Sequence, residues 1–95
     1  MMLPVRTVIV DCAGVRSEAE FWDRYLRLTD AEGSGYFGRN LNAFWDALNG
    51  GPGWPGECEL LFTNAASLAE FRDGRFLEGL QRIADESGLV RVVMS

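Results

Sequence analysis

Three short runs of strand-forming residues, with helical patterns between them, constrain the fold of this chain more than any other feature. The runs span Thr7–Val10, Cys58–Phe62 and Leu89–Met94. Parallel strands need long crossover connections, usually helices, whereas antiparallel strands are joined by short turns. We therefore expect an α/β fold with a three-stranded parallel sheet flanked by three to four helices. The first run is continuous and β-branched, which is typical of a strand buried on both faces.

Two helices are expected between the first and second strands. One runs from Ser17 to Leu28, because Ser17 and Glu20 have capping-box spacing and the apolar residues after them share one helical face. The other begins after Asn40, a favourable N-cap residue, and stops at the Asn-Gly-Gly-Pro sequence that starts at Asn49. Its apolar residues have helical spacing and are Leu41, Phe44, Trp45 and Leu48.

Two further helices are expected before the last strand. Ser67 and Glu70 repeat the capping-box spacing, which predicts a short helix. Asp73 and Gly74 separate it from a longer helix that ends before Ser87. The apolar residues of that longer helix are Phe76, Leu77, Leu80, Ile83 and Ala84.

Length and charge limit the classes of function. Ninety-five residues suit one hydrophobic core, so we expect a single domain over residues 1–95. The formal net charge is −5, and all nine basic residues are arginine. Such a surface repels phosphate backbones and attracts basic partners, which disfavours nucleic-acid binding. No leader-like or membrane-length apolar run is visible, so a cytoplasmic location is expected.

Catalytic chemistry has little support in the residues. Histidine is absent, which excludes Ser-His-Asp and Cys-His catalytic arrangements. Carboxylate pairs such as Glu57 with Glu59 are the alternative, although surface acids at such spacing are usually solvated. Cys12 and Cys58 fit neither a disulfide framework nor a zinc site and are expected to be free thiols. Phosphate-binding loop motifs are also missing, so we expect no enzyme, no cofactor and no bound metal.

The outward face of the second helix is the strongest candidate for function. With Leu41, Phe44 and Leu48 in the core, the helix presents polar residues on its other side. They are Asn42, Asp46 and Asn49, with Trp45 at the margin. Two glycine-rich loops, 29–38 and 49–56, flank this helix. An acid and two amides beside an aromatic residue suit protein recognition, but the same pattern is typical of the solvated side of an amphipathic helix.

Residues Tyr36–Leu48 resemble the signature segment of the barstar family. The segment reads YFGRNLNAFWDAL, and the family pattern is aromatic-aromatic-Gly-x-Asn-Leu-x-Ala-Leu-Trp-Asp-x-Leu. Nearly every fixed position matches. The resemblance covers essentially the whole chain, including the entry to the first helix at Val15-Arg16-Ser17 and the Trp54-Pro55 step before the second strand.

The resemblance implies a function. Barstar-like proteins are intracellular inhibitors of secreted guanyl-specific ribonucleases, and they place the second helix and the loop before it in the active-site cleft of the enzyme. By this resemblance the chain inhibits a basic microbial ribonuclease in a 1:1 complex. A barstar-like module that binds another basic toxin or a regulatory protein is the alternative.

The same resemblance implies a binding site, in which Asp46 meets the arginines and the catalytic histidine of the ribonuclease. The implied contact residues are Tyr36, Phe37, Gly38, Asn40, Leu41, Asn42, Trp45, Asp46, Asn49 and Gly50. For Tyr36 and Phe37, two roles are open: contact with the rim of the enzyme, or packing of the loop onto the core.

Two positions depart from the family pattern. The family's other acid on the second helix lies one turn before Asp46, where this chain has Asn42. The resemblance also implies an acid on the last helix, and the position that aligns with it is Arg82 in this chain. Glu78 lies one turn before Arg82 and is a candidate to replace that acid. These departures bear on which ribonuclease the protein fits more than on the function itself.

Overall fold

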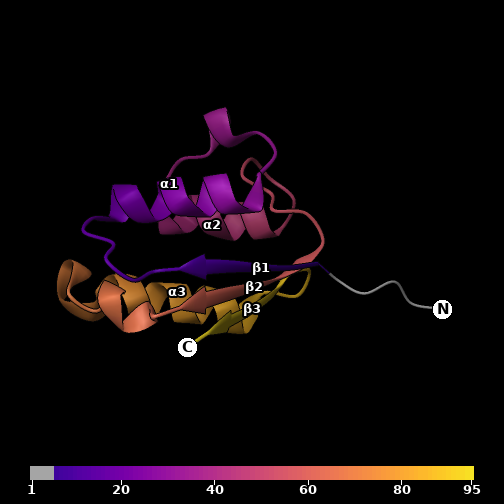
Figure 1. The fold of residues 1–95 in the computed structure, drawn as a ribbon. Coiled ribbons are helices and arrows are strands. Elements are labelled where there is room, and N and C mark those ends of the chain that lie inside the picture. Colours follow the sequence, from indigo (N-terminus) through magenta and orange to yellow (C-terminus); the bar gives the residue numbers. More distant parts are fainter. Residues whose placement is uncertain (1–5) are drawn as a thin grey trace.

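A computed structural model describes residues 6–95 and shows three parallel strands with helices between them (Figure 1). The strands are β1 (Arg6–Asp11), β2 (Cys58–Thr63) and β3 (Arg91–Met94), adjacent in the order β1-β2-β3. The α-helices are α1 (Glu18–Thr29), α2 (Leu41–Leu48) and α3 (Arg75–Glu86). Short 3-10 turns are η1 (Ser34–Tyr36), η2 (Ala65–Leu68) and η3 (Phe71–Gly74). The predicted three-stranded parallel sheet is therefore confirmed.

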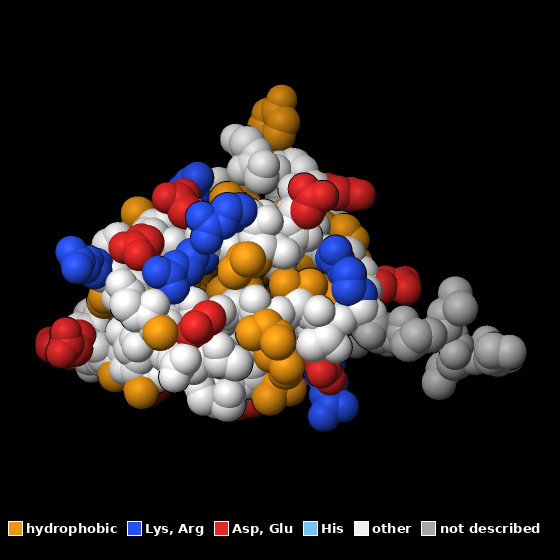
Figure 2. All heavy atoms as spheres, in the orientation of Figure 1, with side chains coloured by type: hydrophobic (Ala, Val, Ile, Leu, Met, Phe, Trp, Pro, Cys, Tyr) orange, Lys and Arg blue, Asp and Glu red, His pale blue; other side chains and the backbone are white. Residues whose placement is uncertain are grey.

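The helices cover one face of the sheet and leave the other open. Val8, Leu60 and Val92 are in register across the strands and pack in the core. Ile9 is in register with Leu61 on the opposite face, and its side chain is 56% exposed. The strands pass in front of α3 in Figure 1, and Figure 2 shows hydrophobic side chains over them in the same orientation.

The expectation that the first strand is buried on both faces is wrong for a topological reason. The strand order β1-β2-β3 moves in one direction across the sheet. Right-handed crossovers that all step the same way place their helices on the same side. β1 is thus an edge strand whose burial alternates along its length.

The start of α1 is as predicted and its end lies one residue after the predicted Leu28, but burial in its last turn differs from the prediction. Ser17 Oγ accepts a hydrogen bond from the Glu20 amide at 3.1 Å, and the Glu20 carboxylate accepts one from the Arg16 amide at 3.3 Å. At the other end Leu28 is exposed, which contradicts its expected place on the apolar face. Thr29 is buried instead. Its hydroxyl donates a hydrogen bond to the Tyr25 carbonyl oxygen at 2.6 Å, which allows the polar side chain to be buried without a bond to water.

The second capping box, at Ser67 and Glu70, was predicted wrongly. η2 and η3 are short 3-10 turns without side-chain caps, because the chain turns tightly to bury Ala65 and Leu68. Arg72 and Asp73 then adopt left-handed backbone angles before α3 begins. The last strand also starts later than predicted, since residues 88–90 form a bend, across which Ser87 Oγ donates a hydrogen bond to the Val90 carbonyl oxygen at 2.6 Å.

A cluster of aromatic rings centred on Trp22 fills the space between the sheet and the helices. Trp22 is fully buried, and its ring centroid lies 4.8 to 6.2 Å from those of its aromatic neighbours. These neighbours come from α1, α2, α3 and the loop before α2: Phe21, Tyr25, Phe37, Phe44 and Phe76. One residue therefore couples all three helices to the loop.

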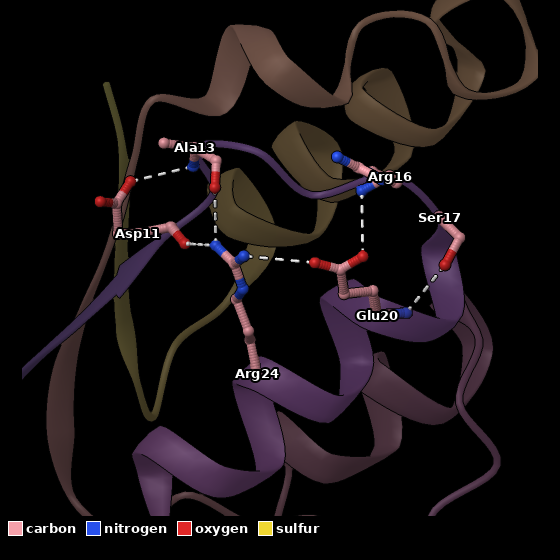
Figure 3. A network of polar contacts seen from close by, with 6 residues as sticks. All are labelled: Asp11, Ala13, Arg16, Ser17, Glu20 and Arg24. Carbon is pink, nitrogen blue, oxygen red and sulfur yellow. Dashed lines mark hydrogen bonds and ion pairs between the residues drawn. The ribbon is translucent and has the colours of Figure 1, made fainter.

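Arg24 of α1 holds the turn that follows β1 (Figure 3). Its guanidinium donates to the carbonyl oxygens of Asp11 and Ala13 at 2.8 Å each and forms an ion pair with Glu20 at 3.2 Å. The Asp11 carboxylate accepts from the Ala13 amide at 2.9 Å and from Asn64 Nδ2 at 2.8 Å. The ends of β1 and β2 are tied together in this way.

The bonds to Asp11 predict a pH-dependent contribution to stability. The hydrogen bond from Asn64, followed by that from the Ala13 amide, lowers the pKa of Asp11 below its usual value of 3.8. A carboxylate with a lowered folded-state pKa stabilises the fold above its unfolded pKa, and the effect disappears as the pH falls through the folded value. Asp11→Ala should therefore lower the urea midpoint at neutral pH, with the difference from wild type shrinking as the pH falls below the usual carboxyl pKa of 3.8. A difference that grows on acidification would contradict this role.

The two cysteines are buried and far apart. Cys58 opens the six-residue strand β2, whereas the Cys12 amide bonds the carbonyl oxygen of Thr63 at the other end of that strand. At about 3.3 Å per residue the separation is about 16 Å, well beyond the Cα distance that a disulfide spans. Burial raises the pKa of Cys12 to about 11 and also raises the pKa of Cys58. Both are expected to stay protonated thiols near neutral pH.

We predict that the folded protein forms no internal disulfide and that both thiols react with a thiol reagent only after unfolding. Mass spectrometry measures both parts of this prediction: the mass after mild oxidation detects a disulfide, and the mass after treatment with the thiol reagent, with and without urea, detects modified thiols. Loss of the two thiol hydrogens from the native monomer would contradict the predicted separation.

Candidate functional site

α2 presents the polar face that its sequence predicts. Phe44, Ala47 and Leu48 are buried, and the outward residues Asn42, Asp46 and Asn49 are exposed. Trp45 lies at the margin with 37% of its surface exposed. Leu41 is half-buried rather than fully in the core. The helix therefore combines a firmly packed inner side with an accessible acidic and amide side.

The N-terminus of α2 is fixed by hydrogen bonds within the site segment. Asn40 is the N-cap: its Oδ1 accepts from the Ala43 amide at 2.8 Å, and its Nδ2 donates to the Gly38 carbonyl oxygen at 3.1 Å. A Cβ atom at Gly38 would lie only 3.1 Å from the Ala43 Cβ, so the chain passes close to the helix here. Arg39 has a left-handed φ of 53° and forms an ion pair with Asp23 of α1. These bonds hold the start of α2 against α1.

Tyr36 and Phe37 have different positions. Phe37 is 6% exposed, and its ring lies 5.4 Å from that of Trp22 and 5.9 Å from that of Tyr25. Tyr36 is 86% exposed in η1, the turn that projects above α1 in Figure 1. Phe37 therefore packs the loop onto the core. The ring of Tyr36 is accessible for contact with a partner.

The loop before α2 is attached to the loop after it. The Glu32 amide donates to the Trp54 carbonyl oxygen at 3.1 Å, and the Gly53 amide donates to the Glu32 carbonyl oxygen at 2.7 Å. The Tyr25 hydroxyl donates to the Gly53 carbonyl oxygen at 2.8 Å, and burial raises the pKa of Tyr25, which keeps this donor protonated. Gly53 is required here, because a Cβ atom would lie 2.5 Å from Phe37 Cδ1. We call this arrangement the loop clamp.

The C-terminus of α2 is also closed by local bonds. The amides of Asn49 and Gly51 both donate to the Asp46 carbonyl oxygen, at 3.1 and 2.9 Å. Asn49 Nδ2 donates to the Trp45 carbonyl oxygen at 2.8 Å. Gly50 has a φ of 98°, a conformation that suits glycine. The backbone on both sides of Asp46 is thus held, while its carboxylate makes no ion pair or hydrogen bond with residues 6–95.

A groove of about 380 Å³ lies beside this face, between α2 and α3. Its walls are Leu41, Asn42 and Trp45 from α2 and Gly79, Arg82, Ile83 and Glu86 from α3. Sequence reasoning singled out Glu78 as a substitute acid, but the acid in the groove wall is Glu86. Helical spacing could have identified Glu86 as a second candidate, because Glu86 lies one turn after Arg82 just as Glu78 lies one turn before Arg82.

The chain was compared with models of known protein families. The family model described as Barstar (barnase inhibitor) matches residues 5–90. The chain belongs to the barstar family. A search of curated proteins finds no match. Barstar-family proteins are inhibitors and not enzymes, and the described fold is consistent with the barstar fold.

Two further observations concern the part of the chain that the structure describes. None of its helices has the length and hydrophobicity needed to cross a membrane. No group of three or more cysteine and carboxylate side chains converges there in a way that could hold a metal ion.

Proposed function

We propose that this barstar-family protein inhibits a basic, secreted, guanyl-specific ribonuclease within the cytoplasm of the cell that makes both. The inhibitor binds the enzyme 1:1 and covers its active site with α2 and the loop before it. The observation that carries the proposal is the exposed Asp46 carboxylate, which has no partner within residues 6–95 and stands on a helix fixed at both ends.

The chemistry of a ribonuclease active site explains why a carboxylate is suited to this task. A cleft that binds RNA phosphate contains several cationic side chains. A carboxylate accepts hydrogen bonds from two guanidinium donors at once, and it offers no bond that the enzyme can cleave. The net charge of −5 favours rapid encounter with a basic enzyme.

Aromatic residues near Asp46 add the apolar part of the surface. Trp45 is half-exposed beside it, and Tyr36 projects from η1. Tryptophan and tyrosine are common among the residues that dominate binding energy at protein interfaces. We place both in the contact surface together with Asn42 and Asn49, and we assign Phe37, Asn40 and Leu41 to holding this surface in shape.

A panel of guanyl-specific microbial ribonucleases tests the proposal. At least one enzyme should lose RNA cleavage at a near-equimolar ratio of inhibitor, and calorimetry should give one binding site. Neither inhibition nor binding across the panel would refute the proposal. Recovery of a basic protein without nuclease activity, by affinity capture from the producing cells, would favour the alternative partner class.

A further inference from the structure

α2 and α3 touch at one tight point on the side of the molecule that carries the proposed inhibitory surface. A Cβ atom added to Gly79 of α3 would lie 2.5 Å from Leu41 Cδ1 of α2. The lack of a side chain at Gly79 therefore allows the two helices to approach closely. The groove along this contact shares Asn42 and Trp45 with the outward face of α2. Because the groove shares these two residues with that face, a partner seated on Asn42 and Trp45 lies at the edge of the groove.

Arg82 places a cation in the wall of this groove, and the carboxylate of Glu86 in the same wall does not form an ion pair with it. The guanidinium groups of Arg24, Arg39, Arg72 and Arg91 each pair with a carboxylate. Among residues 6–95, no carboxylate lies within ion-pair distance of Arg82, although Glu78 and Glu86 flank it on the same helix. Other arginines are also unpaired, but Arg82 is the arginine in the wall of this groove.

A protein partner seated on α2 removes water from the groove, and this changes the energetics of the guanidinium. A buried cation without an anionic partner is strongly unfavourable, whereas a carboxylate that meets the planar guanidinium makes two parallel hydrogen bonds. A cation on the partner at this point adds direct repulsion. The charge that the partner places opposite Arg82 therefore strongly affects the affinity between the partner and this protein.

We propose that the ribonuclease bound by this protein carries a carboxylate on its cleft rim opposite Arg82, and that Arg82 selects against enzymes with a cation there. This inference rests on the proposed inhibitory function and adds the charge pattern of the partner. Asp46 occupies the cationic phosphate site, and Arg82 meets an acidic point beside it. The two opposite charges on neighbouring helices also fix the orientation of the complex.

The test compares Arg82→Glu and Arg82→Gln with wild type against the panel of barnase-type ribonucleases, by inhibition titration. The enzyme that wild type binds most tightly should lose about tenfold or more in affinity with Arg82→Glu and less with Arg82→Gln. Arg91→Glu is the control for net charge, because Arg91 lies beside Glu59 on the open face of the sheet. It should change affinity less than about threefold, as expected for an exposed ion pair. Circular dichroism confirms that each variant is folded.

A second set of measurements locates the partner's carboxylate. Each acid near the cleft of that enzyme is changed to lysine, and one such change should restore binding of Arg82→Glu while weakening binding of wild type. If wild type inhibits an enzyme and Arg82→Glu inhibits it equally well or better, the Arg82 inference is wrong and the inhibitory function stands. If wild type inhibits no enzyme of the panel, the function fails and the inference fails with it.

Discussion

Replacing Asp46 by alanine is expected to weaken ribonuclease inhibition by a factor between about thirty and several thousand. This corresponds to about 2–5 kcal/mol, the usual cost of truncating one partner of a desolvated charge pair. The physical reason is that alanine leaves the cations of the cleft buried and unpaired. Because the Asp46 side chain makes no bond within residues 6–95, stability should change little. Inhibition titrations and dissociation rates measure the effect.

Two matched variants sharpen this experiment. Asp46→Asn keeps the size of the side chain and removes its charge, so it should lose most of the affinity that Asp46→Ala loses. Asn42→Ala, one turn earlier on the same exposed face, should have a much smaller effect because it leaves no charge unpaired. Equal and small effects at both positions would show that the inhibitory contact lies elsewhere.

Replacing Trp22 by alanine is expected to cost about 3–5 kcal/mol of unfolding free energy, the usual range for a large buried aromatic side chain. Trp22 is fully buried, and it contacts rings from all three helices and from the loop before α2. The variant should show a much lower urea midpoint with a similar slope. Trp22→Phe should cost less, since it keeps a ring and removes an indole N–H that has no partner within residues 6–95.

Trp45 provides a control of the same residue type. Its side chain is 37% exposed on α2, so Trp45→Ala should lower the urea midpoint much less than Trp22→Ala does while weakening inhibition. Trp22→Ala should show the reverse pattern at temperatures where it stays folded. An equally large loss of stability in both variants would mean that Trp45 belongs to the core rather than to the contact surface.

Local patterns in the sequence predicted most of the fold. The capping residues Ser17 and Asn40, the helical apolar spacing and the strand-forming runs each act over a few neighbouring residues. The failures arise from long-range structure. Whether Ile9 is covered depends on the side of the sheet to which the crossovers return, and no local pattern encodes that.

The candidate site was predictable to a similar extent. Helical period alone placed Asp46 on the outward face of its helix and Trp45 at the margin. The hydrogen bond from the Tyr25 hydroxyl to Gly53 could not be predicted in this way, because these residues are distant in sequence. The groove beside Arg82 likewise lies between two helices that are distant in sequence and approach closely at Gly79.

The loop clamp has a consequence for the time course of inhibition. Because the segments before and after α2 are already bonded to each other in the unbound protein, little backbone entropy is lost when a partner arrives. Association should then follow a single exponential whose rate rises linearly with enzyme concentration, without a slow isomerisation step. Differences in affinity between enzymes should appear mainly as differences in residence time, so a poorly matched ribonuclease would be captured quickly and released early.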